Sequence, residues 1–106
     1  MREPTFLILT ALADGPRHGY GIVREVRTLS EGRVSLLTGT LYTALDRLTA
    51  EGLIEPDREE EVDGRTRRYY RITTEGLAAL TAQTARLRQL AAAAEARLRT
   101  VRPRTV

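Results

Sequence analysis

The segment from Gly64 to Arg71, GRTRRYYR, places four arginines and two tyrosines within eight residues of a chain that contains no lysine. A guanidinium group binds phosphate or the edge of guanine through paired hydrogen bonds. The residues directly upstream, DREEEVD at positions 57–63, are mostly acidic. The first question is therefore whether these arginines bind an external anion, such as a nucleic acid, or are held by the neighbouring acids.

An Asp-Gly pair at positions 63 and 64 separates two strand-like runs, LIEPDREEEV and RTRRYYRIT. This arrangement predicts a β-hairpin with a two-residue turn. The register that follows from such a turn pairs Glu60 with Arg67, Glu59 with Arg68 and Asp57 with Tyr70. Opposite charges that face each other across an antiparallel pair stabilise it by about 0.2–1 kcal/mol each. We therefore expect the acids to brace the hairpin.

Alternation along the second strand divides its side chains between two faces. Tyr70 and Ile72 share one face with Arg68, and we expect both to pack in the core. Arg65 lies beside the turn, where it has the least competition from acids. We expect Arg65 to be the strongest anion contact of the hairpin. The segment from Gly64 to Arg71 would then stabilise the hairpin at its base and contact an anion at its tip.

The formal net charge of +3 does not by itself indicate nucleic-acid binding, because the surplus lies at one end. Residues 1–53 carry six arginines and six acids, and residues 54–75 carry five arginines and seven acids. Residues 76–106 carry six arginines and one glutamate. Nucleic-acid binding is therefore indicated only by where particular arginines lie, not by the net charge of the whole chain.

Composition excludes several classes of site. The chain of 106 residues has no cysteine and one histidine, His18, which excludes disulfides and thiolate metal sites and leaves a metal-binding or catalytic role for His18 unsupported. The sequence has no glycine-rich phosphate loop, and its hydroxyl and carboxylate residues lack any recognisable catalytic spacing. We therefore expect that the protein is not an enzyme and binds no cofactor. The N-terminal apolar run lacks the cleavage site of a signal peptide and the roughly 20 apolar residues of a membrane span, which predicts a cytoplasmic protein.

Three helices are expected before the hairpin. The apolar run TFLILTAL predicts a buried helix over 4–13, and Ile22, Val26 and Leu29 form one face of a second helix over 18–30. In TGTLYTALDRLTAEG the leucines recur every three or four residues, with Thr38 expected as the N-cap and Gly52 directly after the end. A domain this small buries a limited share of its surface, so a second copy is needed to finish the core.

A long helix is expected from about Thr74 to Arg99, followed by a frayed tail around Arg102–Arg104. Its small and apolar residues recur in a heptad pattern. They therefore form a stripe along one face of the helix, which a monomer would leave exposed to water. We therefore predict a homodimer, with residues 1–73 as one domain and 74–106 as the dimerisation helix and tail. The predicted interface consists of Phe6, Leu77, Leu80, Thr84, Leu87, Leu90, Ala91, Ala94, Leu98 and Val101.

The element order predicts a mainly α fold with a small β-hairpin, a winged helix-turn-helix plus a long C-terminal dimerisation helix. The segments GPRHGYGIVREV, TGTLYTALDRLTAEGLIE and RRYYRITTEG resemble, in order and spacing, three signatures of the PadR family of bacterial transcriptional regulators. The single C-terminal helix is similar to that of the short subfamily. Gly21 and Thr43 depart from the family, which often has Glu and Pro there.

The resemblance implies double-stranded DNA as the partner and a set of contacts from the second helix, the third helix and the hairpin. Other roles stay open for several members: Tyr42 as edge packing, Tyr20 as core, the threonines as plain surface, and Arg47 as an ion-pair partner of Asp46 or Glu51. The full predicted set is Arg17, His18, Tyr20, Thr38, Thr40, Tyr42, Thr43, Arg47, Arg65, Arg67 and Arg68.

The resemblance further implies a ligand-responsive repressor that binds a palindromic operator as a homodimer, with a small hydrophobic or aromatic effector. The sequence offers such an effector little stacking surface, since it has no tryptophan and Phe6 is its only phenylalanine. The alternative is a winged-helix protein-interaction module that dimerises without reading DNA, which the acidic strand and the near-neutral N-terminal half favour.

Overall fold

The computed structural model describes residues 1–101, and the predicted tail at 102–106 lies outside the described residues. Its fold is mainly α with a small antiparallel sheet, as predicted. The elements in chain order are α1 (Glu3–Leu12), β1 (Arg17–His18), α2 (Gly19–Leu29), α3 (Thr38–Ala50), β2 (Ile54–Val62), β3 (Arg65–Ile72) and α4 (Thr74–Leu98).

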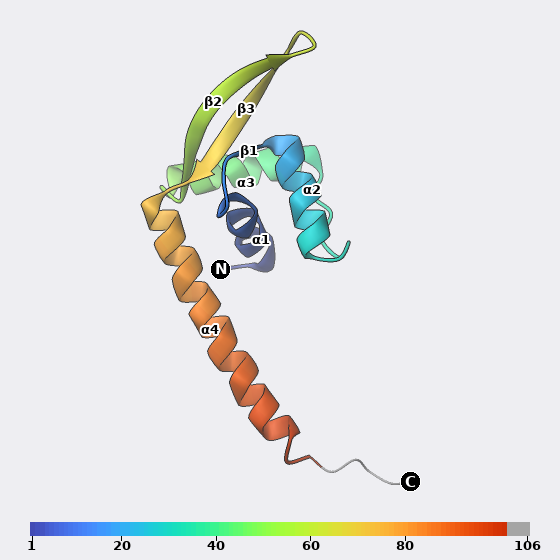
Figure 1. Ribbon diagram of the computed structural model, residues 1–106, viewed down its shortest axis with the longest axis vertical. Coiled ribbons are helices and arrows are strands. Elements are labelled where there is room, and N and C mark those ends of the chain that lie inside the picture. The colour runs from blue at the N-terminus through green and yellow to red at the C-terminus, as the bar shows by residue number, and fades with distance from the viewer. Residues whose placement is uncertain (102–106) are drawn as a thin grey trace.

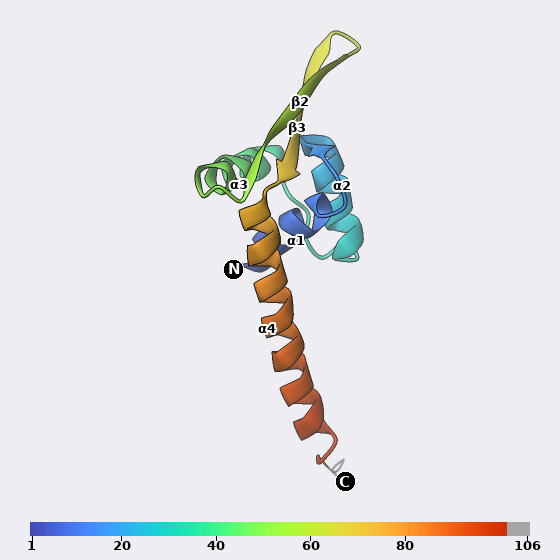
Figure 2. The ribbon, with the colours of Figure 1, turned by 60° about the vertical axis from the view of Figure 1, so that its left-hand side comes forward.

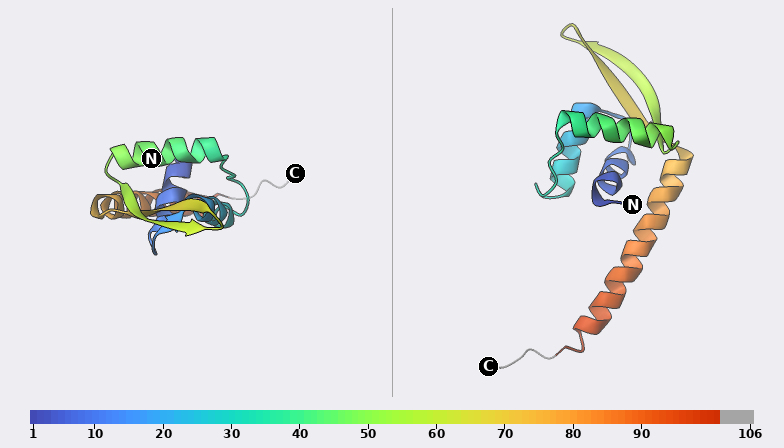
Figure 3. Two further views of the ribbon diagram at one scale, coloured as in Figure 1. Left: turned by 90° about the horizontal axis from the view of Figure 1, so that it is seen from above. Right: turned by 180° about the vertical axis from the view of Figure 1, so that it is seen from behind.

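The three N-terminal helices form one cluster, and the β2–β3 hairpin projects from one side of it (Figure 1). Helix α4 leaves from the base of the hairpin and runs past α1 away from the cluster, which the turned views also show (Figures 2 and 3). The hairpin and the free end of α4 thus lie at opposite ends of the molecule. This is the winged helix-turn-helix arrangement with an appended helix.

The core is built by the apolar faces that the sequence pattern predicts. Leu41, Leu45 and Leu48 of α3 are almost fully buried, together with Ile22 and Val26 of α2. Tyr70 is buried and Ile72 packs against the core, as expected for their face of the hairpin. Leu29 is an exception: it ends α2 and is 41% exposed.

The hairpin has the predicted turn. Asp63 and Gly64 have φ angles of 51° and 74°, the left-handed pair that a two-residue hairpin turn needs. Glu59 faces Arg68 and Glu60 faces Arg67, in the predicted register. The predicted pairing of Asp57 with Tyr70 is wrong, because an irregularity between Pro56 and Glu59 shifts the register and Pro56 faces Tyr70 instead.

Two other details differ from the sequence expectation. The N-cap of α3 is Leu37 rather than Thr38, so the helix begins with a residue whose side chain has no acceptor for the first-turn N–H groups. His18, expected to open the second helix, instead forms with Arg17 the short strand β1, which pairs with β3. Two residues are too few to leave a periodic signal in the sequence.

Thr73 joins the hairpin and the three N-terminal helices to α4. Its hydroxyl donates to the carbonyl oxygen of Gly52 at 2.6 Å and accepts from the N–H of Gly76 at 3.0 Å, which makes it the N-cap of α4. Its own N–H donates to the carbonyl oxygen of Leu53 at 3.0 Å. Gly76 is buried here, and a Cβ on it would collide with that same Leu53 oxygen and lie 2.6 Å from Cγ1 of Ile72.

We predict that Gly76→Ala lowers the free energy of unfolding by about 1–3 kcal/mol, because the added methyl group must displace backbone and a packed side chain. The matched control is Gly21→Ala in α2, where the new Cβ would make ordinary contacts of 3.6 Å or more. The control should gain up to about 1 kcal/mol from helix propensity. Urea denaturation measures both, and a Gly76→Ala protein as stable as the control would contradict the clash.

Candidate nucleic-acid interface

A hollow of about 360 Å³ opens where the starts of α2 and α3 meet strand β3. Strand β3 belongs to the hairpin that projects from the helix cluster (Figure 1). Five of the predicted DNA-contacting residues line it, together with Gly19 and Thr66: His18, Tyr20, Tyr42, Arg67 and Arg68. Residues from three separate stretches of the chain therefore converge on one concave surface.

The contact of α2 with α3 depends on Gly19. A Cβ at this position would lie 2.8 Å from the hydroxyl oxygen of Tyr42 and 3.2 Å from its Cζ, so a larger residue would push the Tyr42 ring from its place against α2. Tyr42 packs on the Gly19 backbone and still exposes 43% of its surface. The edge-packing role considered for Tyr42 is therefore present together with an exposed surface in the hollow. Gly19 was missed from the sequence, where only its place beside two aromatic residues marks it.

His18 is held by the fold from two sides. Its Nδ1 accepts the N–H of Gly21 at 3.1 Å, which makes it the N-cap of α2, and its ring meets Tyr69 edge-on at a centroid distance of 5.3 Å. Burial lowers the pKa of His18, with the Arg67 charge a second cause. Since Nδ1 accepts a hydrogen bond, the neutral ring is the form that the fold stabilises.

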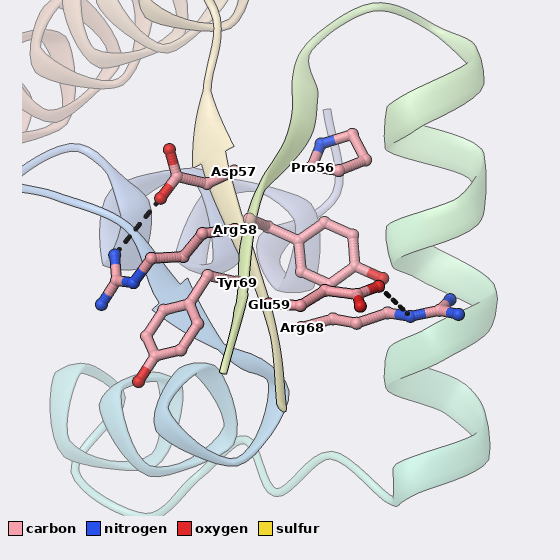
Figure 4. Close-up of a pocket in the computed structure, with 7 residues that line it drawn as sticks. Pro56, Asp57, Arg58, Glu59, Arg68 and Tyr69 are labelled. Carbon is pink, nitrogen blue, oxygen red and sulfur yellow. Dashed lines mark hydrogen bonds and ion pairs between the residues drawn. The ribbon is translucent and has the colours of Figure 1, made fainter. Parts of the chain in front are cut away.

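The arginines of the hairpin differ in whether they form ion pairs within the protein. Arg65 and Arg67 are in none of the ion pairs found among residues 1–101. Arg68 lies 3.4 Å from Glu59, an exposed pair that salt and solvent weaken (Figure 4). Glu60, opposite Arg67, hydrogen-bonds Tyr69 and raises the pKa of its hydroxyl.

Near the base of the hairpin, two acids of β2, Glu55 and Asp57, hold nearby arginines. Arg71 donates to Glu55 at 2.8 Å and to Asp57 at 2.9 Å, and Arg58 pairs with Asp57 at 3.3 Å. Arg58 also stacks over the ring of Tyr69 at 3.9 Å, on the opposite side of the hairpin from Arg68 (Figure 4). The acids near the base thus hold nearby arginines, whereas the tip arginine Arg65 stays free among the described residues.

Two predicted contacts point elsewhere in the protein. Arg17 donates to the carbonyl oxygen of Ala11 at 2.7 Å and also lies near Asp14 and Glu25. Arg47 turns toward α1, where it donates to the hydroxyl of Thr5 at 2.9 Å and pairs with Glu51 at 3.2 Å. Neither lines the hollow. Pairing with Glu51 was the alternative considered for Arg47.

The first turns of α3 are open surface. Thr38, Thr40 and Thr43 are all exposed, and Thr43 donates its hydroxyl proton to the carbonyl oxygen of Gly39 at 3.0 Å. Leu37, directly before them, exposes 76% of its side chain. Leu37 was not predicted as a site residue, because an apolar residue beside a leucine-rich helix is usually buried in the core.

A family model of the transcriptional regulator PadR-like family matches residues 8–82. The chain belongs to the PadR family of transcriptional regulators. The transcriptional regulator Rv3488 of Mycobacterium tuberculosis is 43% identical over 84 residues, which cover 79% of this chain and 75% of that protein.

Solved structures of PadR-family regulators share the fold. A PadR-family transcription regulator from Clostridium difficile superposes with a TM-score of 0.76 at 25% identity, over 92% of this chain and 99% of that one. Bacillus subtilis PadR in complex with operator DNA superposes with a TM-score of 0.69 at 25% identity. That match covers 78% of this chain and 47% of the Bacillus chain.

The family and fold are those of transcription regulators rather than of enzymes. Among residues 1–101, no group of histidine and acidic residues is arranged to hold a metal ion. Within the same residues, no helix combines the length and the apolar character that crossing a membrane requires.

We predict that the PadR-family chain loses stability on acidification through His18. Its folded pKa lies below the ordinary value of 6.5, so the unfolded chain takes up the proton first. The stabilisation is complete above 6.5 and is lost as the pH falls through the lowered folded pKa. His18→Asn keeps an N-cap acceptor without titrating.

Urea midpoints of the two proteins from about pH 7.5 to about pH 5.5 test this expectation. The wild type should weaken more steeply than His18→Asn over this interval. Parallel curves would mean that His18 does not couple folding to pH, and an NMR titration of the single histidine would then report a pKa at or above the ordinary value.

Proposed function

We propose that this PadR-family chain is a ligand-responsive repressor that binds a palindromic operator in double-stranded DNA as a homodimer. The observation that carries the proposal is the hollow between α2, α3 and β3, because it presents two tyrosines, a histidine and two arginines beside a strand of the hairpin. A winged helix-turn-helix inserts its third helix into the major groove with the hairpin beside the backbone. The Bacillus regulator of the same fold is bound to operator DNA, which supports DNA as the partner.

The role proposed for each residue follows from the chemistry of its side chain and from whether that side chain already has a partner within the protein. Arg65 and Arg67, outside the internal ion pairs of the described residues, would neutralise phosphates, and Tyr20, 69% exposed at the start of α2, would donate its hydroxyl proton to one. Thr40 and Tyr42 on the open surface of α3 would face the bases. Arg17 and Arg47 would act through the protein, by holding α1, rather than by touching DNA.

Dimerisation through α4 is supported by what this helix leaves uncovered. Residues 85–100 are all exposed, including Leu87, Leu90 and Leu98 on the predicted seam. A helix with such a bare apolar stripe needs a partner. Leu80 differs from the rest of the seam, since it already packs against the core of its own domain. We therefore assign residues 1–73 to DNA binding and 74–106 chiefly to dimerisation.

An effector site is proposed beside this seam. A hollow of about 290 Å³ lies between α1 and α4, with Phe6, Leu7 and Leu87 among its lining residues and Glu3 and Arg33 at its rim. Glu3 and Arg33 form an exposed ion pair at 3.9 Å. A small hydrophobic compound bound there would touch both the reading domain and the dimer helix. It would change the distance between the two DNA-binding domains of the dimer only to the extent that it binds one arrangement of them more tightly than the other.

Fluorescence anisotropy with DNA from upstream of the protein's own gene, against a scrambled duplex, tests the proposed function. We expect binding to the operator about 10³-fold tighter or more than to the scramble at moderate salt. The alternative is a protein-interaction module, which the internal pairing of Arg17, Arg47 and Arg71 favours. Equal, weak and salt-sensitive binding to the promoter DNA and to the scramble, together with failure to select any tighter duplex from random DNA, would support that alternative.

We predict that Arg65→Ala weakens binding to all DNA sequences similarly and reduces the slope of log affinity against log salt by about one unit. The reason is the loss of one phosphate contact at the hairpin tip. Arg86→Ala, an exposed arginine of α4 away from the hairpin, is the control and should leave the slope unchanged. An unaltered slope in Arg65→Ala would remove Arg65 from the interface.

We predict that Leu87→Asp converts the dimer to a monomer, because two carboxylates would face each other in the α4 seam. Ala85→Asp places the same charge on the same helix two residues away from Leu87 and should remain dimeric. Sedimentation velocity distinguishes the two states. A dimeric Leu87→Asp protein would show that the seam lies on another face of α4.

A further inference from the structure

Leu37 has the most exposed large apolar side chain in the described part of the chain, with 76% of its surface accessible. The other bare leucines lie mostly on α4, where a second copy would cover them: Leu77, Leu87, Leu90 and Leu98. Leu37 lies elsewhere, at the start of α3, and α3 is remote from the free end of α4 (Figures 1 and 3). A dimer formed through α4 would therefore leave Leu37 in water.

Leu37 also contributes little to the helix that it begins. Its backbone is extended, with φ −74° and ψ 150°, which is the conformation of an N-cap. A serine or aspartate in this conformation would accept an N–H of the first turn, but a leucine side chain cannot. Leu37 thus gives the free protein neither a buried side chain nor a cap, which is the pattern expected of a residue that contacts a partner.

The residues that follow make room for that partner. Gly39 has no atom within 4 Å of the position of an added Cβ, so its lack of a side chain relieves no crowding inside the protein. Glycine in a helix is less stable than alanine, and no contact within the chain requires it here. The first turn of α3 therefore presents a projecting leucine beside a bare stretch of backbone, with Thr40 exposed on the next turn.

We propose that Leu37 is a specificity-determining residue that packs on the C5 methyl group of a thymine in the operator. The inference rests on the proposed function, since it requires that the start of α3 enters the major groove. A leucine has no hydrogen-bonding atom in its side chain, and the thymine methyl is the one apolar group that the bases of unmodified DNA present in that groove. Contact with it would make the operator require a thymine at one position in each half-site.

The test removes the methyl group from the DNA and the side chain from the protein separately. An operator is first selected from random duplexes with the wild-type protein, and each thymine is then replaced, one at a time, by deoxyuridine. Anisotropy titrations compare the wild type with Leu37→Ala. The matched control is Leu29→Ala, which truncates an exposed leucine at the end of α2.

For the wild type we expect one thymine in each half-site to lose about fourfold in affinity without its methyl group, the value of one buried methyl. In Leu37→Ala, the affinity should no longer respond to that replacement, while the response to every other thymine stays as in the wild type. Leu29→Ala should keep the full wild-type profile. Leu37→Ser, with an N-cap side chain, should melt at a higher temperature than the wild type and should also lose the methyl response.

A wild-type methyl profile in Leu37→Ala or Leu37→Ser would overturn the proposal and leave the proposed function intact. So would a wild type that is insensitive to every thymine replacement. Failure to select any duplex bound more tightly than random DNA would overturn the proposed function as well, and would indicate that Leu37 binds a protein partner instead.

Discussion

The arrangement of the whole molecule depends on the joint around Thr73. One hydroxyl group bonds the carbonyl oxygen of Gly52, at the end of the turn after α3, and caps α4 through Gly76. The N–H of Thr73 and the close approach of Gly76 both meet the carbonyl oxygen of Leu53, directly before β2. The end of α3, both ends of the hairpin and the first turn of α4 are thus bonded at one place. These contacts leave α4 little freedom to change its angle to α3 by itself.

In the proposed dimer, this rigidity would couple the packing of the two α4 helices to the position of each α3. If α4 and α3 move as one body, the distance between two copies of α3 is set by how the two α4 helices pack. A small sliding of the seam would then change the separation of the two reading domains without distorting either of them. The hollow between α1 and α4 adjoins Leu87 on that seam, so a compound bound there would act on the packing of the helices rather than on the DNA surface.

The hairpin separates two uses of arginine along its length. Near the base, Arg58 and Arg71 are held by Glu55 and Asp57, which fixes the two strands and cancels charge close to the core. Toward the turn, Arg65 and Arg67 are outside the ion pairs of the described residues. Because a phosphate contact needs an arginine that is not already paired, the proposed contact surface lies on the outer part of the hairpin. In that proposal the acids near the base limit where the protein would touch an anion, as well as bracing the fold.

Local patterns predicted much of this structure. The leucine spacing of α3 and the Asp-Gly turn each involve a few neighbouring residues, and both were confirmed. Several of the errors arose where residues of another segment decide the outcome. The register irregularity after Pro56, the strand made by Arg17 and His18, and the turning of Arg47 toward Thr5 all depend on contacts between segments far apart in sequence. No spacing rule within one segment contains that information.

Three glycines illustrate why the remaining site residues were hard to predict. Gly76 is required by the backbone of Leu53, and Gly19 lies against the side chain of Tyr42. Both neighbours are far away in the chain, so these contacts become visible only in the folded protein. Gly39 has no such neighbour, and the residue two positions before it, Leu37, breaks both the capping rule and the burial rule. Sequences that fold well satisfy such local rules nearly everywhere, and violations concentrate where a partner supplies the missing contact. The first turn of α3 is the part of this molecule where two violations fall together on open surface, and it is also the part that a winged helix directs into the major groove.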